Sequence, residues 1–176
     1  MSIFENANID FVFIPSKVLI EKTTNALLAP YSSKFIEMVK EQQELDFAEK
    51  VILRIKNKIG SNPITFGLTV EKEKSYAIWN SLVNKKRIIT LDVCRRSRSN
   101  WQEHNKILPL ILIRNSQVYL LPSWDMELEL DDKVLFVSDE ESKNDLRWIS
   151  KNIYEFYYVY FGKEKNMFNK LFKGGY

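Results

Sequence analysis

Two patterns of apolar residues alternate along the chain: short runs or alternations typical of strands, and a spacing near 3.6 residues typical of helices. The densest apolar run, ILPLILI, covers residues 107–113 and is typical of a strand buried on both faces. Its seven residues are too few to cross a bilayer. The sequence RNSQ follows at 114–117 and suits a hairpin turn because Asn tolerates a positive φ, so we expect residues 118–121 to form the partner strand.

Further strands are predicted on either side of this hairpin. β-branched and aromatic residues are concentrated in four more stretches: 9–14, 64–70, 88–93 and 134–137. After the hairpin, Met126, Leu128 and Leu130 alternate with glutamates. This alternation predicts a half-buried strand that ends in a turn at Asp131 and Asp132.

Helical spacing of apolar residues marks four stretches before the hairpin: 19–27, 35–39, 48–59 and 74–84. Pro30 is expected to end the first helix, Ser32 or Ser33 to cap the second, and Gly60 to end the third. Three successive helices are too many for a simple crossover between strands. We expect them to form an arm that links two lobes or packs against a second subunit.

The C-terminal part also has helical character. Ser138 and Glu141 have the spacing of a capping box, in which the two side chains satisfy backbone amides at the start of a helix. Leu146, Ile149 and Ile153 would lie on its buried side. The aromatic residues at 154–161 either continue this helix or form a short strand.

The order of these elements predicts an α+β protein. Residues 1–61 provide an N-terminal strand and a helical arm. Residues 62–139 form a small lobe with a mostly antiparallel sheet and flanking helices. Residues 140–176 form a C-terminal helix and an aromatic and basic tail.

Composition fits an ordinary globular protein, with 45% apolar and 28% charged residues. The net charge of +3 favours no class of partner, because a nucleic-acid footprint is recognised by clustered charge and not by the total. The single cysteine, Cys94, excludes an intramolecular disulfide and fits a reducing compartment. We find neither a secretory signal nor an apolar run long enough for a transmembrane helix, so we expect a cytoplasmic protein.

The glycines do not form a phosphate-binding loop. A Rossmann-type site needs G-x-G-x-x-G after a strand, whereas the five glycines stand at 60, 67, 162, 174 and 175. P-loop, zinc and nucleophile-elbow motifs are absent too, so we expect no enzymatic activity and assign no cofactor. The simplest interpretation of His104 is a solvated loop residue, and that of Cys94 a partly buried thiol at the end of a strand.

The most prominent cluster of cationic and aromatic side chains comprises Arg95, Arg96, Arg98 and Trp101. Arginines beside an aromatic ring can hold a phosphate and stack on a base, although short charge clusters are also common in solvated loops. Arg114 ends another predicted strand, and we expect it at the same edge of the sheet. The predicted ligand-binding residues, for an anion such as a nucleotide, are Arg95, Arg96, Arg98 and Arg114.

An acidic stretch offers an alternative site for a divalent cation, which prefers oxygen ligands. The candidate ligands are Asp131, Asp132 and Asp139, near the predicted turn. Their spacing matches no EF-hand loop. Strand alternation would also expose acidic side chains in this region without any metal.

The central segment resembles a known family. RNSQ at 114–117 is followed by Pro122, an L-x-L pattern, an acidic turn and KVLFV at 133–137. This order resembles the C-terminal lobe of the regulator-of-potassium-conductance domains (RCK, TrkA C-terminal type). The chain has Asp131-Asp132 where that family usually has Gly-Asp.

Two flanking segments resemble the same family. Residues 145–162, with an Arg-Trp-x-x-x-Asn core, resemble the tail that follows this lobe in bacterial two-helix potassium channels. Residues 10–30 resemble the last strand and linking helix of the family's nucleotide-binding lobe. Residues 1–61 would then be a remnant of that lobe and a linker or dimerisation arm. Because the glycine-rich half is missing, binding of NAD or ATP there is not implied.

The resemblance implies a non-enzymatic, cytoplasmic regulatory module of a potassium channel or potassium uptake system. Such a module would form a homodimer or higher oligomer and sense a small molecule or an ion at the dimer interface. It would act at the inner face of the membrane on a pore protein that is a separate chain, with no nucleic acid as partner. The competing hypothesis is a nucleic-acid or nucleotide-binding protein that uses the basic loop at 95–101.

Overall fold

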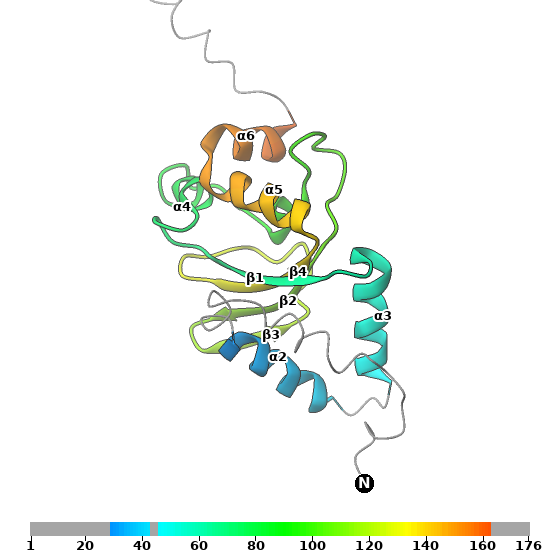
Figure 1. The fold of residues 1–176 in the computed structure, drawn as a ribbon. Coiled ribbons are helices and arrows are strands. Elements are labelled where there is room, and N and C mark those ends of the chain that lie inside the picture. Colours follow the sequence, from blue (N-terminus) through cyan, green and yellow to red (C-terminus); the bar gives the residue numbers. More distant parts are fainter. Residues whose placement is uncertain (1–28, 43–45, 163–176) are drawn as a thin grey trace, which may run out of the picture.

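The computed structural model describes residues 29–42 and 46–162 of the chain. Its elements, in order, are α2 (Ala29–Lys40), α3 (Phe47–Ile59), β1 (Ile64–Thr69), α4 (Tyr76–Val83), the 3-10 helix η2 (Leu91–Arg95), β2 (Ile107–Arg114), β3 (Gln117–Leu120), β4 (Lys133–Ser138), α5 (Glu140–Lys151) and α6 (Ile153–Phe161). Helices and one antiparallel sheet together make an α+β fold, which confirms the predicted class (Figure 1).

The sheet has the strand order β1-β4-β2-β3, and every pair is antiparallel. The predicted hairpin joins β2 to β3, and its turn residues Asn115 and Ser116 both have positive φ, at 47° and 68°. Strand β2 is central in the sheet and contributes side chains to the hydrophobic cores on both faces, which explains its continuous apolar sequence. Its pairing with β4 shifts between Pro109 and Ile111, a bulge that accommodates the missing amide hydrogen of the proline.

Each face of the sheet has its own hydrophobic core. On one face, Leu112, Val134 and Phe136 pack with side chains of α4, α5 and α6, among them Ile78 and Leu146. These helices lie together on that side of the sheet in Figure 1, with α2 and α3 below and beside it.

The opposite face packs on α2 and α3. Its core joins Phe35, Val51 and Ile55 to Leu108 and Leu135 of the sheet. The apolar faces of α2 and α3, from which we expected contact with a second subunit, are therefore covered by the sheet of the same chain. The predicted arm and the lobe share one core.

A buried ion pair ties three strands together at one end of the sheet. The Asp132 side chain is 0% exposed and accepts hydrogen bonds from Nε and Nη2 of Arg114, at 2.8 and 2.7 Å, and from the amide of Glu129 at 2.8 Å. The hydrogen bond to Asp132 raises the pKa of Arg114. Backbone hydrogen bonds join Val70, just after β1, to both Asp131 and Asp132. This one carboxylate therefore positions the ends of β1 and β2 and the start of β4.

Two predicted strands are wrong. Residues 88–93 do not form a strand: the chain makes one bridge, between Thr90 and Glu127, and then turns into η2. Residues 126–130 are irregular too, because their backbone groups bond this first segment, for example through Leu91 N to Met126 O at 2.9 Å. β-branched residues favour strands. Here the apolar side chains are mostly buried in the core, but the backbone does not form a regular ladder of hydrogen bonds with a neighbouring strand.

Helix boundaries also differ from the prediction. Helix α2 begins at Ala29, so Pro30 lies in its first turn, where a missing amide hydrogen costs nothing. Asp139, not Ser138, caps α5, and its Oδ1 accepts from the amide of Ser142 at 2.8 Å. The aromatic segment is a separate helix, α6, capped by Asn152. The strand predicted at 9–14, the helix at 19–27 and the tail after 162 lie outside the described residues.

Within residues 29–42 and 46–162, no helix has both the length and the apolar character that crossing a bilayer requires. The one cysteine, Cys94, is a free thiol in the core below α5 and α6, and burial raises its pKa. A thiol so protected is an inert core side chain at neutral pH.

Replacing Asp132 with Asn is expected to lower the free energy of unfolding by about 3–5 kcal/mol, because Arg114 then keeps a positive charge with no buried partner. Urea unfolding followed by circular dichroism measures the change. Asp131→Asn is the matched control: it removes the same charge from the same turn, and Asn tolerates the φ of 65° at this position. The control should stay within about 0.5 kcal/mol of wild type. Equal losses for the two variants would contradict the role of the ion pair.

Candidate functional site

Helix α3 carries a line of exposed cations beside its buried face. Lys50, Arg54 and Lys58 follow one another at four-residue intervals, which places them on one side of the helix. The adjacent face, about 100° around the helix, buries Val51 and Ile55 against the sheet. The amphipathic pattern that forms the helix thereby also aligns its positive charges.

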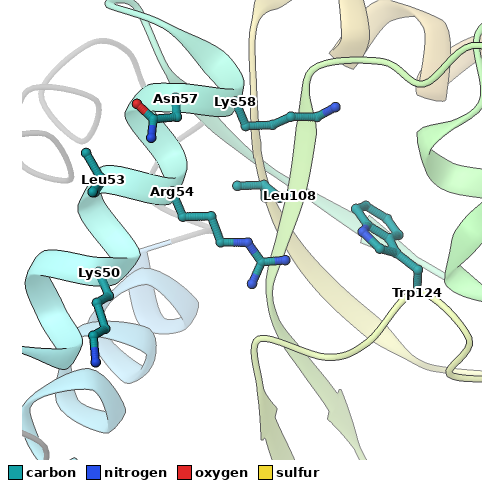
Figure 2. A pocket seen from close by; sticks show the side chains of 7 residues that line it. All are labelled: Lys50, Leu53, Arg54, Asn57, Lys58, Leu108 and Trp124. Atoms are coloured by element: carbon teal, nitrogen blue, oxygen red, sulfur yellow. The ribbon is translucent and has the colours of Figure 1, made fainter.

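These cations line an open groove of about 620 Å3 between α3 and the sheet. Helix α3 contributes Lys50, Leu53, Arg54, Asn57 and Lys58, and the facing residues are Leu108 of β2 and Trp124. Figure 2 shows the side chains of Arg54 and Lys58 extending from α3 to the side on which Trp124 lies, with Leu108 between the two cationic side chains in this view. A groove of this size is within the usual range of small-molecule sites, roughly 300–1,000 Å3.

The two cations nearest to Trp124 have no carboxylate partner. Lys50 forms an ion pair with Asp46 at 3.1 Å. Among the residues that the structure describes, no acidic side chain lies within ion-pair distance of Arg54 or Lys58. The groove therefore presents uncompensated positive charge that attracts anions.

Trp124 forms a fixed wall of the groove. The guanidinium carbon of Arg95 lies 5.0 Å from the centre of its ring, and the amide of Asp92 donates to its carbonyl oxygen at 2.8 Å. The half-buried indole also packs against both cores of the sheet. Since Arg95 does not line the groove, it holds the ring from outside.

Positive charges near the groove affect the pKa of His104. Its partial burial lowers its pKa, and the nearby charges of Arg95 and Arg96 lower it further, with Asp92 opposing them and Lys58 adding a smaller effect. The imidazole is therefore neutral at pH 7. An anion bound beside Lys58 would reverse part of this effect and raise the pKa.

The arginines predicted from the basic loop are bound to carboxylates. Nε of Arg95 and Nε of Arg96 donate to the two oxygens of Asp92, at 2.7 and 2.8 Å. Although partial burial alone would raise the pKa of Asp92, these two hydrogen bonds outweigh it and lower the pKa. Arg98 donates to Glu155 of α6 at 2.7 Å and lies over Trp148 of α5. The three arginines therefore anchor the loop to η2, α5 and α6.

Arg114 does not join this cluster. It ends β2 and binds Asp132 and Glu129, whereas the basic loop leads into the start of β2 at Ile107. A strand of this length separates its two ends by roughly 23 Å. The expected common edge for all four arginines is therefore not formed.

The three predicted metal ligands are also kept apart. Asp132 is occupied by Arg114, Asp131 is exposed, and Asp139 caps α5 at the other end of β4. In the described part of the chain, no group of three or more His, Cys, Asp or Glu side chains is arranged to hold a metal ion. Within this acidic stretch, Asp132 forms the ion pair with Arg114 and Asp139 caps α5.

The sequence analysis missed Arg54, Lys58 and Trp124. The sequence did contain a signal for the two cations. They recur at a four-residue interval on α3, and no acidic residue follows them within the helix to form an ion pair. We interpreted α3 by its apolar face alone. Trp124 lies in an irregular connection, and nothing local in the sequence places it opposite α3.

No protein-family model matches the chain, and no curated protein is significantly similar to it. These comparisons therefore assign no activity to the groove. The geometry and charge of its side chains carry the functional conclusions below.

Replacing Lys58 with Ala is expected to raise the pKa of His104 toward its ordinary value near 6.5, because one repelling positive charge is removed. Proton NMR measures this directly, since His104 is the only histidine in the chain. Lys56→Ala removes the same charge from α3 outside the groove lining and should leave the pKa unchanged. The same shift in both variants would show that Lys58 is not close to His104.

Proposed function

We propose that this chain is a cytoplasmic regulatory module of a potassium channel or potassium uptake system. Support comes first from the resemblance of its β2–β4 region and of residues 145–162 to the RCK C-terminal lobe. The single structural observation that carries the proposal is the cationic groove between α3 and the sheet. A regulatory module needs a ligand site that spans two of its elements, and this groove has one wall on each.

Ligand binding in the groove would be coupled to the position of α3 relative to the sheet. Helix α3 supplies Arg54 and Lys58, while the opposite wall belongs to the sheet and to Trp124. If α3 occupies two positions relative to the sheet, a ligand that contacts both walls of the groove binds the two conformations with different affinity. It therefore shifts the equilibrium between two conformations, which is the requirement for allosteric control.

The module would act as a homodimer or higher oligomer on a pore protein that is a separate chain. The apolar faces of α2 and α3 are occupied by the sheet, so an interface would use other surfaces. Exposed aromatic residues on α5 and α6, namely Trp148, Tyr154 and Phe161, offer such a surface. Large aromatic side chains are enriched at protein interfaces.

The competing hypothesis, nucleic-acid binding through the loop at 95–101, receives less support. Each arginine of that loop already binds a carboxylate: Asp92 holds Arg95 and Arg96, and Glu155 holds Arg98. Phosphate binding there would require breaking these pairs. Arg54 and Lys58 of α3, in contrast, form no ion pair with any described residue.

Deleting the gene for this chain is expected to change potassium transport in the source cells. The measurement is rubidium flux under low and high external potassium, with the wild-type gene restored as the control. Allosteric coupling of about 1–3 kcal/mol predicts a change of about fivefold or more in the regulated flux. Identical fluxes with and without the protein under both conditions would contradict the proposed function.

A further inference from the structure

We propose that the groove between α3 and Trp124 binds a small molecule that carries both a phosphate group and a planar aromatic ring. This inference rests on the proposed function, because it names the class of ligand that the module would sense. Three features lead to it: two cations without an ion-pair partner in the described part of the chain, an aromatic wall with an apolar floor, and the pairing of the adjoining arginines, Arg95 and Arg96, with Asp92.

The two cations match the charge of a phosphate monoester. Arg54 and Lys58 stand one helical turn apart, and both side chains extend into the groove, one on each side of Leu108 in Figure 2. A phosphate monoester carries about −1.5 to −2 charges at pH 7, enough to compensate both, whereas a single carboxylate compensates one. The planar fork of arginine pairs with two phosphate oxygens, and lysine adds a point charge.

The opposite wall suits a planar ring. Trp124 is held in place by Arg95 and the backbone of Asp92, so a ligand ring would meet a preorganised surface. Leu108 supplies an apolar floor beside it. Stacking of a base on an aromatic side chain stabilises the bound ligand. Phosphate alone would leave this wall unused.

The surroundings favour a small molecule over a nucleic-acid strand. A bound strand needs a row of cations that follows successive phosphates. Beyond Trp124, the nearest arginines are Arg95 and Arg96, and Asp92 neutralises both. The cations of the groove therefore do not continue into unpaired arginines at this end of the basic loop.

Isothermal titration calorimetry with adenosine monophosphate, phenyl phosphate, adenosine and inorganic phosphate tests both halves of the proposal. We expect the two aromatic phosphates to bind about tenfold more tightly than adenosine or inorganic phosphate. Arg54→Ala and Lys58→Ala should each weaken their binding about tenfold, and the control Lys56→Ala should leave it unchanged. Binding of adenosine monophosphate should also raise the pKa of His104 in the NMR titration.

Trp124→Leu tests the aromatic wall and should reduce the affinity for aromatic phosphates to that for inorganic phosphate. Since Trp124 also packs on the core, the thermal unfolding of the Trp124→Leu variant is compared with that of wild type. The variants Arg54→Ala and Lys58→Ala change exposed side chains of α3, so they test the site without altering the core. No binding of aromatic phosphates to folded wild-type protein up to about 10 mM would overturn the proposal. Equal affinity in Arg54→Ala, or tighter binding of a single-stranded oligonucleotide than of adenosine monophosphate, would also overturn it.

The ligand class and the proposed function can fail separately. If deletion of the gene changes rubidium flux while aromatic phosphates do not bind, the ligand class is wrong and the regulatory function stands. If aromatic phosphates bind through Arg54 and Lys58 but deletion leaves the flux unchanged, the site stands and the link to potassium transport is wrong.

Discussion

The rest of the structure depends on the buried carboxylate of Asp132. A charge without access to water is tolerated only with a partner, and Arg114 at the end of β2 supplies it. The pairing fixes the turn before β4, and the neighbouring backbone bonds hold the end of β1 through Val70. Strand β4 is thereby held between β1 and β2, and both faces of the sheet are available for helices.

The groove follows from that arrangement. Because one side of α3 is committed to the sheet through Val51 and Ile55, its cationic side lies beside the start of β2. The other wall is Trp124, in an irregular connection held by Asp92 and Arg95. A regular helix thus meets a loop that is fixed by charged groups. Such a combination keeps the two walls of the groove ordered.

The sequence predicted the fold better than the site, for a physical reason. Strand β2 and helix α3 are specified by local periodicity, so both were found. The site was not, because the partners of the candidate arginines lie far along the chain: Arg98 and Glu155 are 57 residues apart. Charges that cluster in sequence can be neutralised in space, and cations spread along α3 can gather into a groove. Residues 88–93 were misassigned because side-chain preference cannot show where their backbone bonds go.

The pairing of β1 with β4 affects how the chain is made. Ile64 pairs with Ser138, and Thr69 with Lys133, so β1 leaves the ribosome roughly 70 residues before its sheet partner. At about 5–20 residues per second, the strand waits several seconds. Its sequence, ITFGLT, contains no charge and no proline to discourage pairing with another chain. During synthesis, β1 is therefore exposed without its sheet partner, and a chaperone that shields it would raise the yield of folded protein.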